Sequence, residues 1–123
     1  MAKPPTPNRL RTAASGVGNS HGKAAEPRMA RSLGMRLQPN SGAMAGAKSD
    51  MKNSHWLVEA KTTVNSTLPI DLGWLIKVTE EALSLGLRPA VALSFVLPSG
   101  RPRPNAETDW VLVPSRVFKE LTE

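Results

Sequence analysis

Three residues near the middle of the chain, Asp50, Glu59 and Lys61, have the types and spacing needed for metal-assisted hydrolysis. Side chains alternate across a β-strand, so Glu59 and Lys61 of the tripeptide Glu59-Ala60-Lys61 share one face and Ala60 points away. Asp50 precedes Glu59 by nine residues. A short turn through residues 52–54 would fold Asp50 back beside that carboxylate. We therefore expect two carboxylates and one amine to meet at one place.

The chemistry of such a cluster follows from its ligands. Paired carboxylate oxygens suit Mg²⁺, and water completes its octahedral shell. A bound ion of this kind polarises a phosphodiester and activates a water molecule. We expect Asp50 and Glu59 to bind Mg²⁺, which Mn²⁺ would replace, with the Ala60 carbonyl as a further ligand. The Lys61 amine would orient the attacking water or stabilise the charge that develops on the phosphate.

The elements that must position these residues follow from hydrophobic periodicity and turn residues. Apolar positions three and four apart predict helices, and apolar or β-branched runs predict strands. We expect an α/β fold with a mixed central β-sheet flanked by helices, in the order α-β-β-α-β-β-α. The predicted elements are a helix over 23–37, a strand hairpin that ends in 55–63, a helix over 69–85 stopped by Gly86, strands over 90–97 and 108–113, and a final helix over 115–121 capped by Ser115.

The bulk composition limits the classes of protein to be considered. Residues 1–22 are rich in proline and glycine and poor in large apolar side chains, so we expect a disordered basic arm before a folded domain over 23–123. The chain has no cysteine, which excludes disulfides and thiolate chemistry. No apolar run approaches the roughly 20 residues that span a bilayer. We expect a cytoplasmic protein without a membrane partner.

The charge is distributed unevenly along the chain. Residues 1–52 carry nine Lys and Arg against two acidic residues, whereas residues 53–123 carry seven against eight. A basic half joined to a neutral half indicates a polyanionic partner, most simply nucleic acid. The alternative is a basic tail that only aids solubility.

The Asp50 and Glu59-x-Lys61 pattern, placed in a predicted hairpin, resembles the signature of the PD-(D/E)xK nuclease superfamily, although Ser49 stands where that family often has proline. The chain is similar in particular to the small Holliday-junction resolvases of archaea and phages, over about residues 23–121. The resemblance implies a restriction-endonuclease-like fold and a Mg²⁺-dependent endonuclease that acts on branched DNA in recombination or phage DNA processing. It also implies a homodimer, because two symmetric cuts need two active sites.

The same resemblance extends the set of site residues. A helical glutamate upstream of the motif corresponds to Glu26, which would complete the active site, and a loop serine corresponds to Ser41. The linker after the motif is expected to contact phosphates. The residues expected to bind nucleic acid are Arg28, Arg31, Arg36, Ser41, Lys48, Thr62, Thr63 and Lys77.

Two other classes of function remain open at this point. A non-catalytic nucleic-acid-binding protein would need only the basic arm and basic helix, and would bind without metal. A structural or partner-binding domain would carry Glu59 and Lys61 as a solvated surface pair of small energetic value. Trp56, Trp74 and Trp110 are expected in the core or at a dimer contact rather than stacked on bases.

Overall fold

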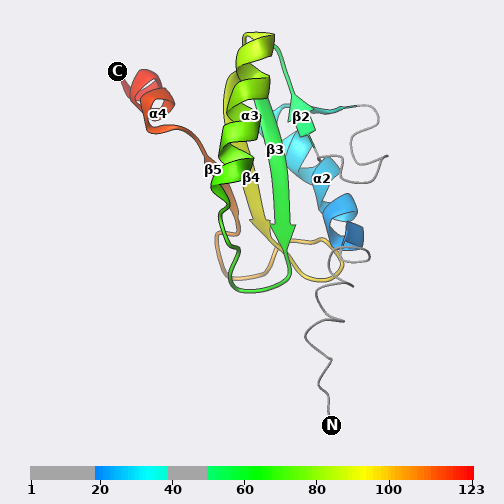
Figure 1. Cartoon of the computed structure of the whole chain (residues 1–123). Coiled ribbons are helices and arrows are strands. Elements are labelled where there is room, and N and C mark those ends of the chain that lie inside the picture. The colour runs from blue at the N-terminus through cyan, green and yellow to red at the C-terminus, as the bar shows by residue number, and fades with distance from the viewer. Residues whose placement is uncertain (1–18, 39–49) are drawn as a thin grey trace.

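The computed structural model describes residues 19–38 and 50–123, in which one mixed sheet of five strands is flanked by helices (Figure 1). This arrangement confirms the α/β class expected from the sequence. The elements in chain order are α2 (Asn19–Leu33), β1 (Arg36–Leu37), β2 (Asp50–Lys52), β3 (Trp56–Thr63), α3 (Leu72–Leu85), β4 (Arg88–Phe95), β5 (Asp109–Leu112) and α4 (Ser115–Thr122).

The sheet has the spatial order β1-β2-β3-β4-β5. The first three strands form an antiparallel meander, β3 and β4 are parallel, and β5 runs antiparallel to β4. Parallel neighbours need a crossover connection, and α3 supplies it between β3 and β4. The longest strands, β3 and β4, therefore form the centre of the sheet.

Two hydrophobic clusters lie on the two faces of this sheet. On one face, α2 packs Met29 against Val58 and Ala60 of β3. On the other face, α3 packs Val78 and Ala82 against Leu57 and Val91. The alternation of β3 side chains thus sends even-numbered residues toward α2 and odd-numbered residues toward α3. Glu59 and Lys61 consequently belong to the α3 face.

Helix α3 is delimited at both ends by identifiable signals. The Asp71 carboxylate accepts a hydrogen bond from the Gly73 amide at 2.8 Å and caps the first turn. Gly86 ends the helix in the left-handed conformation, with φ of 73°, and its amide bonds to carbonyls of the last turn. These two residues set where α3 begins and where it ends.

Replacing Gly86 with alanine should lower the free energy of unfolding by about 1 kcal/mol. A Cβ at this position would meet no atom within 4 Å, so the cost comes from the positive φ alone. Urea unfolding measures it, and Gly86→Asn, which tolerates the left-handed region better, should lose less. Equal losses in the two variants would contradict this account.

Several sequence predictions about the N-terminal half were wrong. The helix expected over 23–37 begins at Asn19 and ends at Leu33, so the last residues of the predicted arm are helical. Gly34, with φ of 68°, stops it, and residues 36–37 form the short strand β1. The element order therefore contains one strand more than predicted. Residues 1–18 of the expected arm, and residues 39–49 of the expected loop, lie outside the described residues.

The C-terminal elements follow the prediction with one correction. Strands β4 and β5 and helix α4 occur where strands and a helix were expected, within two residues. Helix α4 is preceded by Pro114 and has no side-chain cap, so Ser115 does not cap it as expected. Within the described ranges, no helix has the length and apolar character to cross a membrane.

Candidate functional site

The β2–β3 hairpin brings the two predicted carboxylates together. Asp50 of β2 is the direct antiparallel partner of Glu59 of β3. Side chains of directly opposed residues project to the same side of the sheet, with Cβ atoms about 5 Å apart. Asn53 holds the connecting turn, because its side-chain oxygen accepts bonds from the amides of His55 and Trp56, both at 2.8 Å. The turn predicted from the sequence therefore places Asp50 next to Glu59, as expected.

Both carboxylates are buried. Asp50 is 8% exposed and Glu59 is 3% exposed. Glu59 Oε2 lies 3.1 Å from Lys61 Nζ, whereas Glu59 Oε1 has no hydrogen-bond partner within the described part of the chain. A buried carboxylate oxygen without a partner is costly, because its lost hydration is not replaced. Such an oxygen is suited to bind a cation.

Trp74 of α3 completes the surroundings of Lys61. The Lys61 ammonium lies 4.4 Å from the centroid of the Trp74 ring, a distance at which a cation and an aromatic face attract. Lys61 is thus held between the Glu59 carboxylate and an indole. The sequence reading expected Trp74 in the core or at a dimer contact and missed this role. The sequence signal for this contact was the position of Trp74 in the first turn of the helix that follows the strand carrying Lys61.

The donor set fits a hard divalent cation in part. Asp50 and Glu59 supply two carboxylates on one face, and Mg²⁺ typically takes one or two carboxylates and keeps several waters. Among the residues described here, no group of three His, Cys, Asp or Glu is positioned to hold a metal. The Ala60 carbonyl, expected as a further ligand, would add a backbone oxygen to this set. The Ala60 side chain packs in the α2 cluster.

Glu26 lies on the other side of the sheet from this pair. It belongs to α2, and a Cβ built on Gly22 would lie 3.8 Å from Glu26 Oε2 and 3.2 Å from Thr62 Oγ1. The side chain of Thr62 therefore faces α2, whereas Glu59 faces α3. The structure thus does not bring Glu26 onto the face that carries Asp50 and Glu59.

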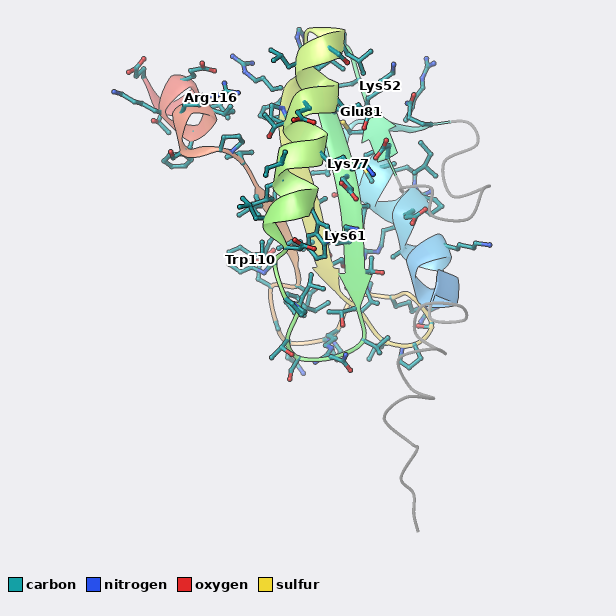
Figure 2. All side chains as sticks on the ribbon, in the orientation of Figure 1. Lys52, Lys61, Lys77, Glu81, Trp110 and Arg116 are labelled. Atoms are coloured by element: carbon teal, nitrogen blue, oxygen red, sulfur yellow. The ribbon has the colours of Figure 1, made fainter. Side chains whose placement is uncertain are left out.

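The basic residues expected to bind nucleic acid occupy two surfaces. Arg31 and Arg36 are exposed on α2 and β1, and Lys77 is exposed on α3. Figure 2 shows Lys52, Lys77 and Lys61 along the β2 side of α3, with Glu81 among them. The charged side of α3 thus lies above the β2–β3 hairpin.

The remaining residues expected to contact nucleic acid lie at the end of β3 or outside the described residues. The Thr63 side chain is buried and its oxygen accepts a bond from the Asn65 amide at 3.0 Å, so it holds the turn after β3. Thr62 is half-buried on the α2 face. Ser41 and Lys48 lie outside the described residues.

Arg28 has protein partners instead of an open position. Its guanidinium donates to Asp109 Oδ2 at 2.5 Å and to Ser94 Oγ at 3.0 Å, and Ser94 in turn donates to Asp109 Oδ1 at 2.5 Å. Ser94 is fully buried in β4, and Asp109 begins β5. The three side chains join α2 to the two C-terminal strands, so Arg28 has a structural role.

Exchanging Arg28 and Arg31 for alanine should separate folding from DNA binding. Arg28→Ala should lower the free energy of unfolding by about 2 kcal/mol, because Asp109 loses its positively charged partner in a partly buried site and keeps only the Ser94 hydroxyl. Arg31→Ala should leave stability unchanged, since its side chain is exposed, and should reduce the salt dependence of DNA binding by about one counterion. Urea unfolding and fluorescence-anisotropy titrations at several salt concentrations measure both. A stable Arg28→Ala protein with weaker DNA binding would assign Arg28 to phosphate contact.

Helix α3 divides its face of the sheet into two unlike halves. Trp74, Lys77 and Glu81 recur at helical spacing on the side toward β2. Leu72 and Ile76 lie on the opposite side, toward β5, where they line an apolar groove. The candidate site lies in the charged half.

No protein-family model, no curated protein and no solved structure matches the chain.

Proposed function

We propose that this protein is a Mg²⁺-dependent DNA endonuclease of the PD-(D/E)xK type. The observation that carries the proposal is the buried pair of Asp50 and Glu59, with Lys61 3.1 Å from one Glu59 oxygen and the other Glu59 oxygen without a partner among the described residues. A solvated surface pair would have both charges in water. Burial of the Glu59 carboxylate with one oxygen lacking a partner among the described residues has an energetic cost that a cation would offset.

The arrangement of elements supports the same proposal. A helix precedes an antiparallel meander whose third strand carries Glu59 and Lys61, and a crossover helix then leads to a parallel strand. This is compatible with the restriction-endonuclease-like fold that the resemblance implies. Strand β1, which the sequence prediction lacked, extends the catalytic hairpin to three strands without moving Asp50 or Glu59.

In the proposed mechanism, Asp50 and Glu59 would hold the cation, and the Ala60 carbonyl would be a further ligand. The ion supplies charge neutralisation at the scissile phosphate and activation of water. Lys61, oriented by Glu59 and the Trp74 ring, donates to the attacking water or to the phosphate oxygen that gains charge. Water attacks phosphorus in line and passes a proton to solvent, while the bond to the leaving oxygen breaks and that oxygen takes a proton from solvent, so configuration at phosphorus inverts.

The substrate we propose is branched DNA, and the four-way junction is the first candidate. A homodimer with two active sites would cut it in the cytoplasm. Support comes from the excess of basic residues in the N-terminal half and from the exposed Arg31, Arg36 and Lys77. Basic side chains bind the phosphate backbone without regard to sequence. A branched substrate would therefore be selected by its shape.

The test is a cleavage assay with a labelled four-way junction and a linear duplex of matched sequence, each with Mg²⁺ or with EDTA. Symmetric cuts on the junction that require Mg²⁺ are the expected result. Equal cutting of both substrates would retain the nuclease and reject the resolvase.

A second candidate is a non-catalytic nucleic-acid-binding protein. It is favoured by a groove of about 550 Å³ lined in part by Arg36, Lys52 and Asn53, where phosphates could bind without any metal. The same assay separates the two candidates. Tight DNA binding that is unaffected by EDTA, with no cleavage of either substrate, would reject the enzyme and leave this function.

A further inference from the structure

The apolar half of the α3 face forms a groove that the proposed nuclease site does not use. The groove has a volume of about 520 Å³ and lies between α3 and the end of β5. Its lining includes Leu72, Ile76, Val91, Leu112 and Pro114. Leu72 is 66% exposed. Exposed apolar surface gathered in one groove is typical of an interaction site rather than of an ordinary monomer surface.

Helix α4 is the second exposed apolar element, and it starts where the groove ends. Figure 1 shows α4 set apart from the sheet, at the end of the segment that follows β5. Val117 is buried, but Phe118 is 61% exposed and Leu121 is 54% exposed. These two residues are three apart and share one side of the helix. An eight-residue helix is marginal in water unless its apolar side packs against something.

The ion pair that joins α4 to the rest of its own chain is weak. Glu120 Oε1 lies 3.5 Å from Arg88 Nε, and both side chains are largely exposed, so the pair contributes little. This contact involves the polar side of α4. The side chains of Phe118 and Leu121 are therefore free to pack against an exposed apolar surface of another chain.

We propose that the groove binds helix α4 of a second copy of this chain, and that the exchange is reciprocal. Each chain supplies both an apolar groove and an apolar helix, which is the requirement for a two-fold, self-complementary interface. An α4 about 12 Å long fits along an α3 about 21 Å long. Charge agrees as well, because the charged residue that lines the groove is Glu80, and α4 carries Arg116 and Lys119 against the single acidic residue Glu120.

A second copy suits the groove better than the chain's own α4. Pro114 lines the groove and directly precedes α4 at Ser115, and the helix leads away from the groove from that point. A two-fold partner brings its α4 in from outside without any change in either chain. The proposed interface lies on the β5 side of α3, opposite the side that carries Trp74 and faces Lys61.

The first test measures the mass of the full chain in solution without DNA, by size-exclusion chromatography with light scattering. We expect twice the mass of one chain. Ile76→Glu in the groove and Phe118→Glu on α4 should each raise the dimer dissociation constant roughly 100-fold. Leu85→Glu is the matched control, because Leu85 is 48% exposed on the same helix, does not line the groove and lies nine residues from Ile76, on the opposite side of α3. It should leave the dimer intact.

Mixing the two variants distinguishes exchange from other arrangements. In each homodimer of a single variant, both groove–helix contacts are damaged. In a heterodimer of Ile76→Glu with Phe118→Glu chains, one contact combines both changes and the other is fully native. The mixture should therefore dimerise more tightly than either variant alone. A monomeric parent chain, or a dimer unaffected by both substitutions, would overturn the proposal, and so would a mixture no tighter than its components.

These outcomes are independent of the nuclease assay. Loss of dimer mass without loss of cleavage on a linear duplex would separate this interface from the active site. Absence of cleavage in a parent chain that dimerises as described would reject the nuclease and keep the interface. Circular dichroism of each variant shows that a lower mass is not caused by unfolding.

Discussion

Glu59→Gln should reduce the cleavage rate by about 1000-fold while leaving the free energy of unfolding at least as large as in the parent. Glutamine has the size and shape of glutamate but lacks the charge that binds a hard cation. The parent keeps a carboxylate that is 3% exposed, with one oxygen lacking a partner among the described residues. The substitution removes that unfavourable buried charge. Single-turnover cleavage at saturating DNA and urea unfolding measure the two effects.

The control for this prediction is Glu107→Gln, which removes the same charge from an exposed loop residue. It should change neither cleavage nor stability. A Glu59→Gln protein that cuts at the parent rate would show that Glu59 is not a metal ligand. A variant that loses cleavage together with more than about 2 kcal/mol of stability would point to a structural role for the carboxylate instead.

Lys61→Met should reduce cleavage by about 100- to 1000-fold with little loss of DNA affinity, and should also lower stability. Methionine keeps an unbranched side chain of similar length and lacks the ammonium group that lies over the Trp74 ring. The buried Glu59 carboxylate then loses its counter-ion, which costs about 2 kcal/mol, a value reduced from that of a fully buried pair because the Lys61 side chain is 28% exposed. The two substitutions at this ion pair therefore have opposite effects on stability.

The two changes can be combined to measure their coupling. Lys61→Met made in the Glu59→Gln background should cost less stability than in the parent, since no buried charge is left behind. Lys77→Met, an exposed lysine on the same side of α3, is the control. It should weaken DNA binding and its salt dependence slightly while preserving the rate at saturating DNA. Additive stability changes at residues 59 and 61 would show that their contact is energetically unimportant.

The hairpin was predictable because local rules determine it. Glu59 follows Asp50 by nine positions, and Asn53 favours a turn between them, so the pairing register follows from short-range geometry. The helix over 72–85 was predictable for a similar reason, since its apolar spacing and Gly86 act within a few residues. Both features depend little on the rest of the chain.

Other features depend on contacts that the order of residues does not reveal. The apolar spacing that predicted a helix through Leu37 was overridden at Gly34, and β1 is defined only by its pairing with β2. The position of Trp74 over Lys61 depends on how the crossover helix settles on the sheet. Arg28, expected at DNA, pairs with Asp109, which is 81 residues away in sequence. Such long-range choices arise only when the whole core packs.

The division of the α3 face into a charged and an apolar half also restricts where the chain can accept inserted residues. Successive residues of a helix are rotated by about 100°, so one inserted codon within α3 would turn every later side chain away from its neighbour. Lys77 and Glu81 would leave the charged half, and Val78 and Ala82 would leave the core. The loop over 97–108 carries no such periodic requirement. A library of random single-codon insertions should therefore be depleted across residues 72–85 and tolerated in that loop.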